Sequence, residues 1–192
     1  MHTLYYAATS PYSRKIRVLV AEKGLSCAVE LVLCAPFDRP ADLVALNPLS
    51  KVPTLVTDDS QVLIDSPVIA EYLDRLAAPR LIPSEGRSRW DALRRQALAD
   101  GIIDAGVSML GEHPRDWMER KTAVIIRALD AFEAEIDTFE ESMTIGHIAL
   151  GCALGRLDFR MAALDWRAGR TKLARWNEDF QARPSMQATR PV

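Results

Sequence analysis

Cysteine and histidine are scarce in this chain of 192 residues, with three of each, and their placement excludes two kinds of site. Cys27, Cys34 and Cys152 form no CxxC pair. An odd number of scattered cysteines argues against a disulfide framework and favours a reducing compartment. The histidines show neither an HxxxH nor an HExxH pattern, so we expect no bound metal ion.

The sequence also lacks an excess of either charge and lacks long apolar runs. Lysine and arginine number 24, and aspartate and glutamate number 26, so the basic surplus of a nucleic-acid-binding protein is missing. No apolar run approaches the roughly 18 residues of a membrane span. The first six residues have no basic segment leading into an apolar one. We therefore expect a cytoplasmic protein with no nucleic-acid partner, no membrane span and no signal peptide.

The pattern that is present changes near residue 77. Before it, period-two and helical segments alternate in the order βαβ, then α, then ββα. The predicted strands are residues 3–7, 27–33, 52–56 and 61–64, and the predicted helices are 11–23, 40–46 and one that starts at Ser66. Residues 78–88 contain two prolines and a glycine and are interpreted as a linker. Residues 89–192 predict an all-α domain with helices at 90–110, 116–139, 144–159 and 172–183.

Ser10 stands between the first predicted strand and a helix that opens with Pro11. A helix N-terminus carries partial positive charge and free N–H groups that favour an anion, and a serine hydroxyl there can donate to a thiolate. Lowering a thiol pKa by one or two units requires about 1.4–2.7 kcal/mol of thiolate stabilisation. The same serine is also explained as an ordinary helix N-cap, which is the interpretation that the motif alone favours.

Two further motifs have the same ambiguity. Val52-Pro53 starts a predicted strand, where a cis bond would turn the Val52 main chain outward to pair with a peptide-like ligand. Asp65-Ser66 opens another helix, where the serine can bind a carboxylate and the aspartate an ammonium group. The hypothesis of a site for an amino-acid headgroup depends on all three motifs together.

These residues, in this order, resemble the glutathione S-transferase superfamily, and most nearly its bacterial serine-type members of the theta/zeta-like kind. The resemblance covers almost the whole chain. It is carried by TSPYSRKIRVLVAEKGL, NPLSKVPTL and DSPVIAEYL in the first half, and by IALGCALGRLDFR and ARPSMQAT in the second. It implies a thioredoxin-like glutathione-binding domain at residues 1–77 and an all-helical domain with the co-substrate pocket at residues 89–192.

The resemblance also implies roles. Ser10 would activate the sulfur of glutathione, the co-substrate, and the Val52 main chain would pair with its cysteinyl part beside a cis-Pro53. Asp65 and Ser66 would hold the γ-glutamyl end.

Further roles concern the other end of glutathione and a second subunit. Lys51 and Arg39 would lie near the glycyl carboxylate. Asp100 would reach glutathione across the interface of a homodimer, with Asp104, one helical turn on, as its rival.

The resemblance places the pocket for a small hydrophobic electrophile under the segment 107–117. That segment is short here, which predicts an open and shallow pocket. Its candidate walls are Met109, His113 and Trp166.

Some features depart from the family pattern or allow alternatives. Thr144 can cap the helix predicted at residues 144–159. His147 stands where the family usually has a carboxylate that accepts a hydrogen bond from the N-cap main chain, so we expect this second half of the capping box to be lost. The three cysteines are expected to be packing residues. Tyr5 and Tyr6 are alternatives to Ser10, because some classes of the family use a tyrosine nearby.

Three functions remain in competition. The first is a glutathione transferase acting on a hydrophobic electrophile. The second is a non-catalytic binding or regulatory protein of the same fold. The third is a glutathione-dependent peroxidase, dehalogenase or isomerase.

Overall fold

The computed structural model describes residues 1–139 and 142–191, and it confirms the predicted order of elements. In the first half these are β1 (His2–Tyr6), α1 (Pro11–Glu22), β2 (Val29–Leu33), the 3₁₀ helix η1 (Pro36–Asp38), α2 (Ala41–Leu46), β3 (Thr54–Val56), β4 (Val62–Leu63) and α3 (Ser66–Asp74). In the second half they are α4 (Gly86–Ser108), α5 (Arg115–Glu135), the 3₁₀ helix η2 (Ile136–Thr138), α6 (Ile145–Arg160), α7 (Thr171–Gln181) and α8 (Pro184–Ala188). Helix α8 and both 3₁₀ helices were not predicted.

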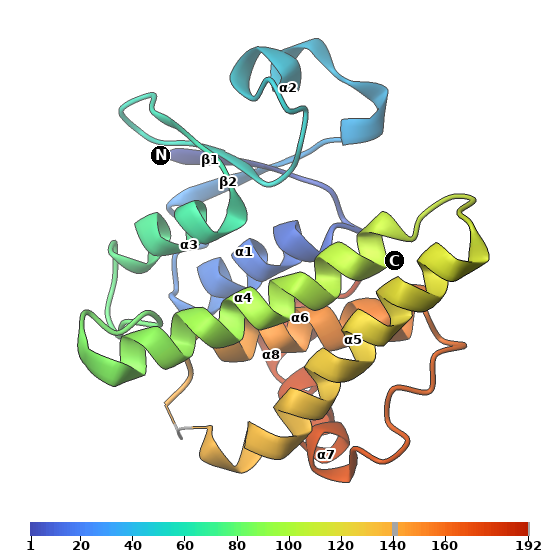
Figure 1. Cartoon of the computed structure of the whole chain (residues 1–192). Helices are drawn as coiled ribbons and strands as arrows, with labels where there is room; N and C mark the ends of the chain where they lie inside the picture. Colours follow the sequence, from blue (N-terminus) through green and yellow to red (C-terminus); the bar gives the residue numbers. More distant parts are fainter. Residues whose placement is uncertain (140–141, 192) are drawn as a thin grey trace.

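The four strands form one sheet in the order β2-β1-β3-β4. β1 runs parallel to β2 and antiparallel to β3, so α1 supplies the crossover that a parallel pair requires. Leu4 of β1 pairs with Leu55 of β3, and both are fully buried. Figure 1 shows α1 and α3 on the side of the sheet that faces the helical half and α2 on the opposite side. This is a thioredoxin-like domain.

Helix α6 is the centre of the helical half, and it is buried at every residue from Ile145 to Leu154. Glycines let its neighbours approach closely. A methyl group at Gly151 would lie 2.4 Å from a ring carbon of Phe180 on α7, and one at Gly155 would lie 2.3 Å from the Arg14 guanidinium on α1. Because the Phe180 ring is packed in the core, Gly151 fixes how α7 packs on α6, whereas a side chain at Gly155 would require the end of the Arg14 side chain to shift.

The start of α6 corrects one expectation. The structure shows a complete capping box, in which the Thr144 main-chain N–H donates to Nδ1 of His147 at 3.1 Å. An imidazole nitrogen without a proton is a hydrogen-bond acceptor, as a carboxylate oxygen is. His147 therefore supplies the second half of the cap that we expected to be lost.

The cysteines correct another expectation in part. Cys152 is fully buried in α6 and Cys34 is half-buried, but Cys27 is exposed. The prediction was wrong for Cys27 because β2 starts only at Val29, and the residues before it form a turn at the surface.

The segment between the two halves is held by one buried ion pair. Lys23 Nζ donates to the Asp74 carboxylate at 2.9 Å, and also to the carbonyl oxygens of Asp74, Ala77 and Pro79. The same carboxylate accepts from the main-chain N–H groups of Leu81 at 2.7 Å and of the residue after it at 3.1 Å. Helix α4 then begins at Gly86, inside the stretch interpreted as a linker.

Candidate functional site

The N-terminus of α1 begins as its sequence predicts. Ser10 is the N-cap, and its Oγ accepts from the Ser13 main-chain N–H at 3.2 Å, while Pro11 occupies the first turn. Ser10 is half-buried, and its O–H stays available to a ligand because this bond uses the oxygen only as an acceptor. Ser13 is fully buried and its Oγ accepts from Ala7 N–H at 3.4 Å. Of the two serines, Ser10 is the one that a ligand can reach.

The two tyrosines considered as alternatives have other surroundings. Tyr5 lines a hollow of about 230 Å³ together with residues of β2 and α2, and Figure 1 shows α2 on the side of the sheet away from the helical half. The Tyr6 ring lies under the Arg17 guanidinium, at 4.7 Å.

The Val52–Pro53 peptide bond is cis. Val52 lies just outside β3, and its main-chain N–H and C=O make no hydrogen bond within the described ranges. The exposed Lys51 precedes it, and the exposed Arg39 follows η1 with a φ of 48°. The start of β3 therefore offers free main-chain groups, with two cations in the adjoining loops.

The N-terminus of α3 carries the third motif. Asp65 is the exposed N-cap, and its carboxylate accepts from the Ser66 N–H. Ser66 is 1% exposed, and its Oγ has no hydrogen-bond partner among the residues described. A buried hydroxyl without a partner costs roughly 1–3 kcal/mol, so this group is poised for a ligand.

Two carboxylates of α4 face α1. Asp100 binds Lys15 Nζ at 2.6 Å, and Lys15 is fully buried. Burial raises the pKa of Asp100 although Lys15 acts in the opposite direction. The Tyr12 hydroxyl donates to Asp104.

Of the three aspartates considered for the site, Asp104 is the one in hydrogen-bond contact with Tyr12 among the described residues. Burial is the main cause of the raised pKa of Tyr12, followed by the bond to Asp104, while Asp100 and Asp65 contribute through their charge. Asp100 already has a partner within its own chain, which the sequence did not indicate.

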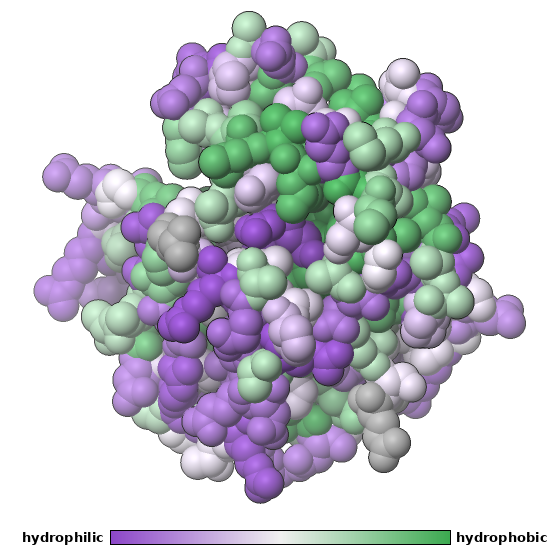
Figure 2. Space-filling view, turned by 180° about the vertical axis from the view of Figure 1, so that it is seen from behind, coloured by the Kyte–Doolittle hydropathy of each residue, from purple (hydrophilic) through white to green (hydrophobic). Residues whose placement is uncertain are grey.

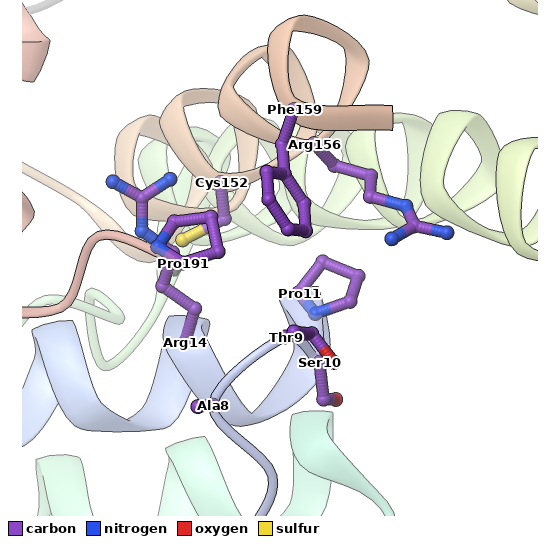
Figure 3. Close-up of a pocket in the computed structure, with 9 residues that line it drawn as sticks. All are labelled: Ala8, Thr9, Ser10, Pro11, Arg14, Cys152, Arg156, Phe159 and Pro191. Carbon is purple, nitrogen blue, oxygen red and sulfur yellow. The ribbon is translucent and has the colours of Figure 1, made fainter. Parts of the chain in front are cut away.

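Ser10 also lines a small hollow of about 10 Å³ between α1 and α6 (Figure 3). Arg14 and Arg156 contribute to its walls, together with the thiol of Cys152. Burial raises the pKa of that thiol to about 11, so it is protonated and a poor nucleophile at neutral pH. Phe159 adds an aromatic wall. Sequence reasoning missed both arginines, although Arg14 belongs to the same motif as Ser10.

The three residues expected to wall the co-substrate pocket do not meet in this hollow. Met109 packs partly against the helical core, and exposed His113 stacks on Trp117 with ring centroids 4.3 Å apart. Trp166 is 1% exposed, and its indole N–H donates to Asp158 at 2.8 Å. A side chain so deeply buried presents no surface to a ligand.

In the described part of the chain, no group of three or more His, Cys, Asp or Glu side chains is placed to hold a metal ion. None of its helices combines the length and apolar character that crossing a membrane requires.

Known proteins resemble this chain in sequence and structure. The family profile described as glutathione S-transferase, N-terminal domain, matches residues 9–76, and the corresponding C-terminal domain profile matches residues 115–178. A crystal structure of a glutathione transferase family member from Pseudomonas fluorescens Pf-5, with bound glutathione, is 41% identical, with a TM-score of 0.95 and complete coverage of both chains.

Two curated proteins extend this comparison. The uncharacterized GST-like protein YibF of Escherichia coli (strain K12) is 31% identical over 194 residues, covering 95% of each chain. The maleylacetoacetate isomerase of Pseudomonas aeruginosa is 40% identical over 85 residues, which are 42% of this chain and 39% of that protein. With both domain profiles matched and relatives aligned along nearly their whole length, the chain belongs to the glutathione S-transferase family.

Proposed function

We propose that the protein is a glutathione transferase in which Ser10 stabilises the glutathione thiolate. The observation that carries the proposal is the set of unpaired polar groups in the thioredoxin-like domain. These are the buried Ser66 hydroxyl, the free Val52 main chain and the Ser10 O–H at a helix N-terminus. Support comes from the glutathione held by the Pseudomonas fluorescens relative.

Each group suits one part of glutathione. Asp65 binds the γ-glutamyl ammonium, and Ser66 binds the adjoining carboxylate through its hydroxyl and its helix N-terminus. The Val52 main chain pairs with the cysteinyl amide as an added strand does, next to cis-Pro53. Lys51, with Arg39 nearby, attracts the glycyl carboxylate.

The reaction begins with the thiolate. The Ser10 O–H donates to the sulfur, and the partial positive charge at the start of α1 adds to its stabilisation. The thiolate attacks an electrophilic carbon of the co-substrate held by the helical domain. A carbon–sulfur bond forms, the leaving group departs with its electron pair, and the thiol proton passes to solvent. The gain comes from a populated thiolate and from proximity.

A second candidate is a glutathione-dependent isomerase. It is favoured by the match of 85 residues to the maleylacetoacetate isomerase. The same thiolate would add to a double bond and leave again after rotation, so glutathione would be regenerated. Recovery of all the glutathione after turnover separates isomerisation from conjugation.

The proposed assembly is a homodimer in which an aspartate of α4 approaches the partner's glutathione. Because Asp100 is already paired with Lys15, Asp104 competes for that role. Sedimentation, followed by glutathione titration of Asp100→Asn and Asp104→Asn, decides which carboxylate contributes to binding.

The decisive experiment is calorimetric titration with glutathione combined with thiolate absorbance across pH. Ser10→Ala is expected to raise the bound thiol pKa by about 1–2 units, with little change in affinity. Ser66→Ala is expected to weaken binding about tenfold. Ser26→Ala, at an exposed position, is the control. An unchanged thiol pKa in Ser10→Ala contradicts the assignment, and absence of glutathione binding by the unmodified protein favours the non-catalytic alternative.

A further inference from the structure

Two buried arginines flank the hollow beside Ser10. Arg14 of α1 is 4% exposed and Arg156 of α6 is 6% exposed. Figure 3 shows their guanidinium groups on opposite sides of the Phe159 ring, above the start of α1. Arginine remains charged at any pH a protein meets, so the hollow beside Ser10 has two positive charges in its walls.

These arginines differ from others of the chain in their partners. Arg14 donates to Gln181 Oε1 at 3.2 Å and to the Met186 carbonyl oxygen at 3.0 Å, both of which are neutral. Arg156 donates no hydrogen bond to any described residue. By contrast, Arg183 binds the Glu22 carboxylate at 2.8 Å. Within the described ranges, no carboxylate forms an ion pair with Arg14 or Arg156.

Unsatisfied donors accompany the unpaired charge. The Nε–H groups of Arg14 and Arg156 are both buried without a hydrogen-bond partner. A buried charge without a counter-charge is costly, and that cost falls when an anion binds. Arg14 has a structural task, since it ties α1 to α7 and α8. Arg156 donates to none of the residues that the structure describes, so an anionic ligand would offset the cost of its burial.

The surrounding charges increase the attraction for an anion. Burial is the main cause of the lowered pKa of Arg14; Cys152 acts in the opposite direction, and the neighbouring Arg17 and Arg190 lower the pKa further. Burial, followed by Arg160, lowers the pKa of Arg156, and Tyr12 is the one group that opposes this. The cluster is therefore basic on several sides.

We propose that the co-substrate is an electrophile that carries a carboxylate, and that Arg156 binds this carboxylate. The inference rests on the proposed function, because it names the class of molecule that the glutathione thiolate attacks. The hollow has room for a group about the size of a water molecule, so an oxygen of the carboxylate enters it beside Arg156 and the rest of the molecule lies outside, next to Ser10. Phe159 and Pro11, which line the hollow, contact the apolar part of the molecule at its mouth. The hydrophobic electrophile expected from the sequence thus gains an anionic end.

The test compares two electrophiles of the same shape and different charge. They are a benzoate with a para chlorine and a meta nitro group, and the benzamide with the same ring substitution. In each, the thiolate attacks the carbon that bears chlorine, a carbon–sulfur bond forms, and chloride leaves with the bonding pair. The proteins are the unmodified chain, Arg156→Gln, Arg156→Lys and the control Arg127→Gln. Arg127 is exposed on α5 and does not line the hollow.

We expect the unmodified protein to prefer the benzoate in kcat/KM, corrected for the uncatalysed rates, by about tenfold or more. Arg156→Gln abolishes this preference, Arg156→Lys restores part of it, and Arg127→Gln retains it. Glutathione affinity stays unchanged in all variants, which shows that they are folded. An equal preference in the unmodified protein and Arg156→Gln overturns the inference.

A second measurement keeps the inference apart from the proposed function. The two glutathione conjugates are synthesised, and their binding is measured by calorimetry without turnover. If glutathione binds but neither electrophile reacts, the transferase proposal fails. Binding of the two conjugates then still tests whether Arg156 binds a carboxylate. Tighter binding of the carboxylate conjugate that depends on Arg156 supports the inference, and equal binding overturns it. If glutathione itself does not bind, both proposals fail.

Discussion

Replacing Lys23 with methionine tests how the two halves of the protein are joined. Methionine keeps the apolar stem of the side chain and removes its charge. Lys23 is 6% exposed and Asp74 is 1% exposed, and three carbonyl oxygens share the same ammonium group. The substitution therefore leaves a buried carboxylate with two main-chain N–H donors and no counter-charge.

The magnitude follows from that isolation. Breaking a buried pair by removing one partner costs about 3–5 kcal/mol. For a chain of this size, each kcal/mol lowers the melting temperature by about 2–4 °C, so we expect a decrease of roughly 6–20 °C. Urea unfolding and calorimetry of Lys23→Met measure both quantities.

A matched control lies next to Asp74 in the sequence. Arg75 binds Glu71 at 2.9 Å in an exposed pair, so Arg75→Met is expected to cost less than about 0.5 kcal/mol. A double-mutant cycle with Asp74→Asn isolates the coupling between the buried partners. Lys23→Met with the stability of Arg75→Met, or a coupling near zero, refutes the role assigned to this pair.

Three further predictions concern packing, pH and reactivity. Gly151→Ala is expected to destabilise by about 1–3 kcal/mol in urea unfolding, because the added methyl overlaps a buried ring. Gly101→Ala, which meets open space within α4, is expected to stabilise by about 0.5–1 kcal/mol, and equal effects of the two would contradict this packing. The hydrogen bond from Arg183 lowers the Glu22 pKa, so this carboxylate stabilises the fold above its unfolded pKa and loses that effect as pH falls through its folded pKa. Glu22→Gln should reduce the loss of unfolding free energy at acidic pH. The same loss in Glu22→Gln and in the unmodified protein would show that the Glu22–Arg183 pair does not stabilise the fold. Iodoacetamide at neutral pH should modify exposed Cys27 and spare Cys152, whose pKa is about 11, as peptide mapping can show.

The order of strands and helices was predictable because its signals are local. Proline at the start of α1 and the positive φ of 66° at Gly24 after its end mark that helix from both sides. Start positions were less certain, and α4 begins four residues before the predicted Trp90. Helix α8 has five residues, too few to show a helical period.

The site was predictable only where a motif carries it. Ser10, Val52-Pro53 and Asp65-Ser66 each fall in a short segment with its own turn or cap signal. The pair of Lys15 with Asp100 joins residues 85 apart in the sequence, and no spacing rule reports such a contact. Trp166 was expected in a pocket but lies in the core. The prediction failed because the sequence does not reveal whether an aromatic side chain faces a pocket or the core.

The hydrogen bonds between α1 and residues 183–186 can form only late in translation. Arg14 finds its acceptor at Met186, and Glu22 its donors at Arg183 and Ser185, across separations of 161 to 172 residues. Synthesis proceeds from the N-terminus, and α1 emerges long before these partners exist. Until residues 183–186 have been translated, Arg14 and Glu22 of the thioredoxin-like half therefore lack the partners that they have in the folded protein. A ribosome stalled before residue 183 would hold a nascent chain in which these bonds of the first helix are still unmade.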